Sequence, residues 1–229
     1  MTPEAVFRSR QSRRMRHHVA LAATVVVTLA AVELTSPKVS TFSMTTAYLA
    51  LLLYAASFSL GPLNLIRRRP NPVSTDLRRD IGIWIGITAV LHVLFGWRVH
   101  MKYWWEYLLR SSEHVHGWRL RLDAFGLTNW IGVVATLMLV LLVLISNDAA
   151  LRRLRTSRWK QLQRSSYIAA LLIVAHGVLY QMIEKRDARL VLTGAIICFG
   201  AAVIQTRGRR AYLRNASHRS SAANVSVPE

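Results

Sequence analysis

Two histidines lie inside long apolar stretches of the sequence. His92 belongs to the stretch DIGIWIGITAVLHVLFGWRVH, which carries no charged residue between Ile81 and Trp97. His176 belongs to YIAALLIVAHGVLYQM, which is equally free of charged residues. Because an imidazole inside a membrane costs free energy unless it has a partner, each histidine is a candidate for a functional site.

The two histidines lie at the same distance from the charged start of their stretches. The interval from Asp80 to His92 equals the interval from Arg164 to His176. At about 1.5 Å per helical residue, both imidazoles lie about 18 Å from that start. Two imidazoles at equal depth on parallel membrane helices are what the axial ligation of one b-type heme requires. We therefore expect His92 and His176 to bind heme iron; hydrogen bonds across the helix bundle are the alternative.

The other histidines carry weaker signals. His100, near the outer end of the same stretch as His92, is a candidate for binding a heme propionate, with exposure to solvent as the alternative. The histidines that we expect to be solvated or on a loop surface are His17, His18, His114, His116 and His218.

Six apolar stretches are long enough to form membrane-spanning helices. They cover residues 19–34, 44–66, 81–97, 127–146, 165–183 and 190–205. The chain is 52% hydrophobic yet has a net charge of +19, with its charge concentrated between these stretches. This pattern predicts an all-α membrane protein, a bundle of six transmembrane helices within residues 19–205.

The distribution of basic residues predicts the orientation. With alternating spans, 21 of the 30 Lys and Arg residues fall on the side of the two termini. By the positive-inside rule, both termini are cytoplasmic and the spans carrying His92 and His176 run in the same direction. We expect a basic cytoplasmic segment at 1–18, an uncleaved first span rather than a signal peptide, and a disordered basic tail at 206–229.

The long external connection, residues 98–126, is rich in Trp and Tyr. Aromatic residues at this density are typical of a short amphipathic helix in the outer membrane interface. The same segment is also suited to cover a site beneath it.

Several classes of protein are disfavoured. The arginines lie in short loops, which indicates topology rather than nucleic-acid binding. No nucleotide fingerprint or nucleophile–base motif is present, and the single cysteine, Cys198, excludes a disulfide framework. The spans are poor in carboxylates and no repeat is visible, which disfavours a transporter.

The stretches LRRDIGIWIGITAVLH and RWKQLQRSSYIAALLIVAH resemble the ferric reductase-like transmembrane domain. This family includes the membrane parts of ferric reductases and NADPH oxidases and the bacterial heme-binding subunit of the periplasmic methionine sulfoxide reductase system. Larger members bind two stacked hemes through a second histidine nearer the start of each ligand helix. Here the corresponding positions are Arg79 and Gln163, so the resemblance implies a single heme b. A flavin such as FMN, a quinone or a direct docking surface for the donor would have to bridge the missing inner position.

We expect an electron-transfer subunit rather than a self-contained enzyme. It would pass electrons from a separate cytoplasmic flavin reductase or quinol to an external redox protein or ferric iron. The chain has no soluble domain large enough for NADPH or FAD, so donor and acceptor must be separate molecules. The alternative is a non-catalytic membrane scaffold subunit of a larger complex.

Overall fold

The computed structural model describes residues 3–67, 75–111 and 117–225. Its helices are α1 (Pro3–Thr35), α2 (Val39–Ile66), α3 (Thr75–Gly96), α4 (Ala124–Leu144), α5 (Asp148–Gln163), α6 (Ser166–Glu184) and α7 (Ala188–Val225). Six helical segments in this part of the chain are long and apolar enough to cross a membrane. The prediction of an all-α bundle with six such helices is confirmed, and the chain is a multi-pass membrane protein.

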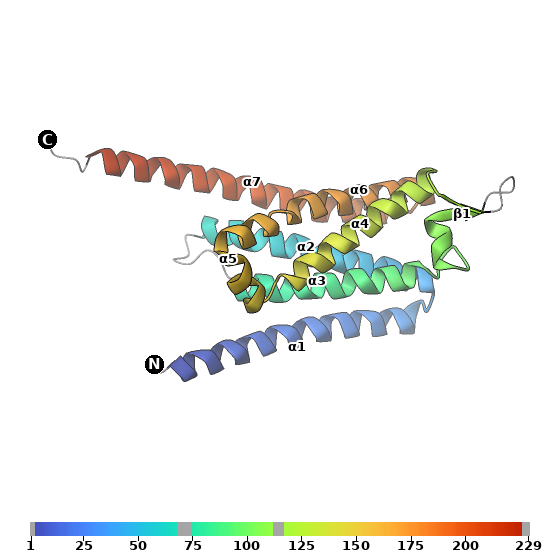
Figure 1. Ribbon diagram of the computed structural model, residues 1–229, viewed down its shortest axis with the longest axis horizontal. Coiled ribbons are helices and arrows are strands. Elements are labelled where there is room, and N and C mark those ends of the chain that lie inside the picture. Colours follow the sequence, from blue (N-terminus) through green and yellow to red (C-terminus); the bar gives the residue numbers. More distant parts are fainter. Residues whose placement is uncertain (1–2, 68–74, 112–116, 226–229) are drawn as a thin grey trace.

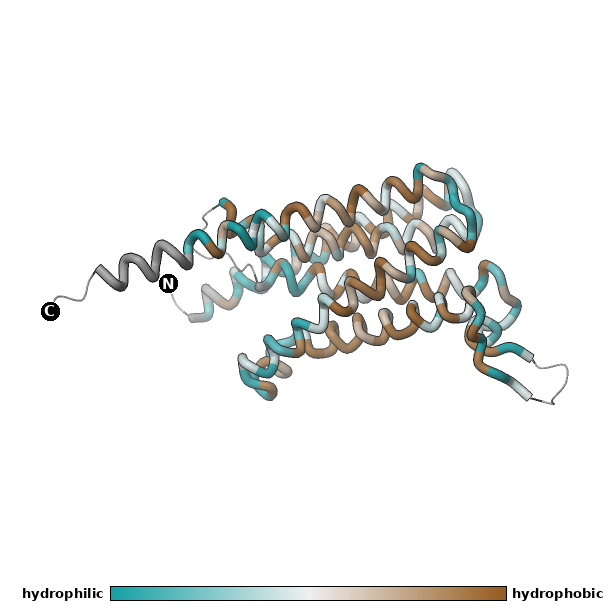
Figure 2. Tube along the Cα trace, turned by 90° about the horizontal axis from the view of Figure 1, so that it is seen from above, coloured by the Kyte–Doolittle hydropathy of each residue, from teal (hydrophilic) through white to brown (hydrophobic). Residues whose placement is uncertain are grey.

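The long helices alternate in direction along the bundle (Figure 1). Both termini and α5 lie at one end, which we call the terminal end, and the connection between α3 and α4 lies at the other, which we call the hairpin end. Hydrophobic residues occupy the middle of the bundle and hydrophilic residues gather at both ends (Figure 2). Because α3 and α6 each run from the terminal end to the hairpin end, equal offsets along them correspond to similar heights.

Helix packing brings the two histidine helices into one group. α2 packs against α3 and α7, α4 packs against α6, and α3 contacts α4. α1 lies against α2 and α3. Threonines fill close contacts inside this group: Thr46, Thr88 and Thr128 are fully buried, and each hydroxyl donates to a carbonyl of its own helix, which satisfies its polar atom without a partner helix.

The connection at the hairpin end differs from our expectation. Instead of an amphipathic helix it contains a 3₁₀ turn, η1 (Trp104–Tyr107), and an antiparallel hairpin of β1 (Leu109–Ser111) and β2 (Trp118–Leu120). The two strands are held by antiparallel pairing, in which Leu109 lies opposite Leu120 and Ser111 lies opposite Trp118. His114 and His116 lie outside the described residues.

Helices extend into both terminal segments of the part of the chain that the structure describes. α1 starts within the basic N-terminal segment, and α7 continues to Val225, so the described part of the tail is helical where we expected disorder. No Gly or Pro follows Gly208 until Pro228, and Ala, Arg and Leu in this segment favour a helix.

α5 is an additional helix that we did not expect. Asn147 caps its start, because its side chain accepts a hydrogen bond from the Ala150 amide at 2.7 Å. The helix bends at Arg155, whose φ of 58° lies in the left-handed region. α5 therefore forms a bent helix at the terminal end of the bundle (Figure 1).

Candidate functional site

His92 is held by α2. Its Nδ1 lies 2.8 Å from the carbonyl oxygen of Ser43 and 3.2 Å from the Ser43 hydroxyl. Because a carbonyl only accepts hydrogen bonds, Nδ1 carries the proton in this contact. In the neutral imidazole the lone pair is then on Nε2, the nitrogen that remains for a metal.

His176 is held in the same way by α4. Its Nδ1 lies 2.8 Å from the carbonyl oxygen of Thr128. This contact also assigns the proton to Nδ1 and the lone pair to Nε2. The hydrogen bonds across the bundle that we considered as an alternative are therefore present, and both use the nitrogen that a metal ligand would not need.

The structure brings the two rings together. The ring centroids of His92 and His176 are 6.2 Å apart, and the ring planes make an angle of 75°. Two imidazoles that bind one metal atom from opposite sides, through bonds of about 2 Å, have centroids about 6 Å apart. The pair would therefore suit one heme iron in ligand type, tautomer and centroid separation.

Gly132 of α4 makes room for the ring of His176. A Cβ built at this glycine would lie 2.7 Å from both Cε1 and Nδ1 of His176. Any side chain at this position would displace the imidazole from its hydrogen bond with Thr128. Nothing in the sequence signals this contact, because Gly132 is one of several glycines within apolar stretches.

His100 lies near the hairpin end and already has a partner. Its Nε2 lies 3.1 Å from the Glu184 carboxylate, which also lies 3.9 Å from Arg186. Two buried indole N–H donors, those of Trp105 and Trp130, have no hydrogen-bond partner among the described residues. Donors of this kind, together with His100 and Arg186, suit acidic groups such as propionates.

A series of contacts between aromatic rings extends from the histidine pair towards the hairpin end. The ring of Tyr180 lies 5.1 Å from that of His176, and its hydroxyl donates to Asn129. Phe125 lies 6.1 Å from Tyr180 and 6.0 Å from His100 by ring centroids.

The two positions that carry inner histidines in larger proteins of the resembled family have other contacts here. Arg79 donates to Asp148 at 2.6 Å, and Gln163 lies 3.3 Å from the Ser146 hydroxyl. Asp148 lies outside the membrane spans, and its hydrogen bond with Arg79 holds the pKa of its carboxyl below the ordinary value. Arg79 and Asp148 thus join α3 to the start of α5, and Gln163 joins the end of α5 to the segment just after α4.

His17 and His18 are not solvated as we expected. Both contact the fully buried carboxylate of Asp80, through His17 Nδ1 at 2.9 Å and His18 Nε2 at 3.3 Å. Arg14 donates to the same carboxylate at 2.9 Å, and the Trp84 indole donates to His18 Nδ1 at 3.1 Å. The prediction failed because the partner, Asp80, is distant in the sequence and lies on another helix.

Within the described residues, no group of three or more His, Cys, Asp or Glu side chains is arranged to hold a metal ion. The histidine pair supplies two ligands, which suits a metal that already has equatorial ligands of its own. No protein-family model matches the chain, and no curated protein matches it significantly.

Proposed function

We propose that this protein is a transmembrane electron carrier that binds one heme b through Nε2 of His92 and of His176. The observation that carries the proposal is the pairing of the two imidazoles at 6.2 Å, each with its Nδ1 bonded to a backbone carbonyl. A heme in this position would supply reversible one-electron transfer through its iron.

The residues of the chain would hold and tune the metal. The carbonyls of Ser43 and Thr128 fix the orientation of the two rings and make Nε2 a stronger donor to a metal. Gly132 allows the His176 ring to keep this orientation. The apolar helices around the pair limit access of water, which influences the potential of a bound redox group.

The direction of transfer follows from the charge distribution. We propose that the terminal end faces the cytoplasm, because 21 of the 30 basic residues belong to its side, and that the protein resides in the cell inner membrane. The donor, a flavin reductase or a quinol, would then approach near α5, whose exposed basic residues attract acidic or phosphate-bearing molecules. The acceptor, a redox protein or ferric iron, would approach the hairpin end.

The donor must pass an electron from the terminal end to the histidine pair without a second heme between them. Because Arg79 and Gln163 have the contacts described above, a second heme is not expected there. An FMN or a quinone that binds close to the terminal end would shorten the distance between donor and histidine pair.

The test is a reduced-minus-oxidised absorption spectrum with a heme-to-protein ratio for the purified protein. We expect a b-type spectrum with one heme per chain, lost in His92→Ala and in His176→Ala. His18→Ala, which removes an imidazole outside the pair, is the matched control and should keep the spectrum. A protein without heme from heme-replete cells would refute the proposal, and two hemes per chain would refute the assignment at Arg79 and Gln163.

A non-catalytic scaffold subunit is the second candidate function. One observation favours it. His92 bonds to Ser43 and His176 bonds to Thr128, and these two hydrogen bonds would stabilise the helix bundle even without a heme. In that case both alanine variants would lose stability, and neither the variants nor the unaltered protein would contain heme.

A further inference from the structure

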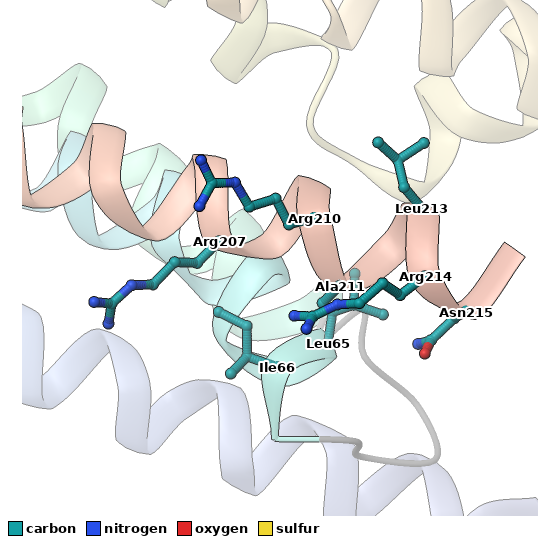
Figure 3. A pocket seen from close by; sticks show the side chains of 8 residues that line it. All are labelled: Leu65, Ile66, Arg207, Arg210, Ala211, Leu213, Arg214 and Asn215. Carbon is teal, nitrogen blue, oxygen red and sulfur yellow. The ribbon is translucent and has the colours of Figure 1, made fainter. Parts of the chain in front are cut away.

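A pocket lies at the terminal end, where α7 extends beyond the end of α2. Its lining includes Leu65 and Ile66 from α2 and Arg207, Arg210, Leu213 and Arg214 from α7. Its volume is about 740 Å³, within the range of roughly 300–1,000 Å³ that is typical of small-molecule sites. The pocket combines an apolar wall with cationic groups (Figure 3).

The close contact of α7 with α2 forms the base of this pocket. A Cβ at Gly208 would lie 2.5 Å from Cβ of Pro62, so the two backbones touch at this point. One turn earlier on α7, the Gln205 amide donates to the Phe58 carbonyl at 2.8 Å. α2 ends at Ile66, one turn after Pro62, whereas α7 continues. These two contacts fix the position of α7 against α2 at the base of the pocket.

The cationic groups are concentrated on one short part of α7. Arg207 and Arg214 are two turns apart and extend on the side of Ile66 (Figure 3). Arg207 and Arg210 have no ion-pair partner among the described residues, although like charges one turn apart destabilise a helix. A bound anion would offset this repulsion.

The position of the pocket indicates which anion. α7 changes from hydrophobic to hydrophilic along this part (Figure 2), so the pocket lies at the level where a bilayer places its headgroups. Guanidinium groups bind phosphate through paired hydrogen bonds. Leu65, Ile66 and Leu213 supply apolar surface, which a free phosphate ion would not use.

We propose that this pocket binds the headgroup of an anionic phospholipid. Arg207 and Arg214, which extend on the side of Ile66, would contact the phosphate, and Arg210 would add positive charge at the rim. The apolar wall would contact the glycerol backbone and the start of the acyl chains. This inference does not depend on heme binding and concerns the opposite end of the bundle from His100.

The test is native mass spectrometry of the full-length protein after reconstitution into bilayers of phosphatidylethanolamine and phosphatidylglycerol. The pocket variant is Arg207→Gln/Arg210→Gln/Arg214→Gln. The matched control is Arg152→Gln/Arg153→Gln/Arg158→Gln, which removes three exposed charges of α5 outside the pocket. Leu213→Glu, a single change at an exposed position, places a negative charge at the wall if the triple variant does not fold.

We expect the unaltered protein and the control to retain phosphatidylglycerol in preference to phosphatidylethanolamine. The pocket variant should lose this preference by at least about tenfold, since loss of one hydrogen bond to a charged group already costs roughly a factor of ten. Leu213→Glu should lower it in the same direction. Equal losses in both triple variants, no preference in the unaltered protein, or complete displacement of the lipid by inorganic phosphate would each overturn the proposal.

Discussion

Two backbone carbonyls determine what His92 and His176 can do. Each carbonyl accepts a proton from Nδ1, at 2.8 Å in both cases, so each ring has its Nε2 lone pair available. Carbonyls of helices cannot change rotamer, and the two imidazoles are therefore oriented before any ligand binds. Such orientation lowers the entropy lost when a metal binds.

Gly132 gives a direct test at the level of a single residue. In Gly132→Ala, the new Cβ would lie 2.7 Å from His176 ring atoms, so the ring must leave its contact with Thr128. Loss of a hydrogen bond that supports a metal ligand weakens metal binding by about 10–100-fold, and we expect at least tenfold weaker heme affinity. Heme titration of the apoprotein measures this effect.

The control for this change is Gly82→Ala on α3, where nothing lies within 4 Å of the new Cβ. It should bind heme as the unaltered protein does. Equal heme affinity in the two alanine variants would show that the His176 orientation does not matter for binding.

The histidine pair could be predicted from the sequence, whereas its supporting contacts could not. Depth along a helix follows from counting residues, and this places His92 and His176 at one level. Ser43 and Thr128 support the rings mainly through backbone carbonyls, which every residue type has, so their identities carry little signal.

At the level of helices, Asp80 attaches α1 to α3. In Asp80→Asn the charge that Arg14, His17 and His18 contact is removed, and Arg14 is left without its carboxylate. Loss of a hydrogen bond to a charged group lowers the free energy of unfolding by about 2 kcal/mol. The loss is smaller than for a fully buried ion pair, because Arg14 is partly solvated. We expect a decrease of that size in unfolding free energy and faster amide hydrogen exchange in α1.

Glu33→Gln is the control for this experiment, because it neutralises an exposed carboxylate at the far end of α1. Its exchange rates should remain those of the unaltered protein. If Asp80→Asn also leaves α1 protected, the buried carboxylate does not attach this helix.

The attachment of α5 depends on pH through Asp148. Its pKa in the folded protein is held below the ordinary value by the hydrogen bond from Arg79 and by the charge of that guanidinium. A lowered folded pKa means that the contact stabilises the protein above the unfolded pKa of about 4 and is lost as pH falls through the folded pKa. We expect the α5 amides to become less protected from hydrogen exchange only below about pH 4.

Asp148→Asn supplies the comparison, since it removes the titrating group. The variant should show weaker α5 protection already at neutral pH and no further change in acid. The same acid-induced change in the variant and the unaltered protein would assign the pH dependence to another group.

The long helices were predictable because each contains enough consecutive apolar residues to span a bilayer. The shorter elements were not. The strand β2 has only three residues, too few for a periodic pattern to be distinctive. The basic residues of α5 were interpreted as a loop that is either a topology signal or a docking place for an acidic partner, and neither interpretation implies a helix. The helical tail shows that a polar composition does not by itself exclude a helix.

At the level of the whole molecule, the common position of the two termini makes the orientation testable. We expect alkaline phosphatase fused after Leu122 to be active, because this residue follows the hairpin, which we assign to the outer side. A fluorescent protein fused at the C-terminus should fluoresce, because we assign that end to the cytoplasm. The opposite pattern would reverse the direction of electron transfer that we propose.

The central claim is that both imidazoles bind one iron, and electron paramagnetic resonance of the oxidised protein tests it most directly. Two imidazole ligands produce low-spin ferric heme, and ring planes 75° apart should give a strongly anisotropic low-spin signal, equivalent to one spin per chain. A high-spin signal in the intact protein would mean that one of the two histidines does not bind iron, and this would contradict the account.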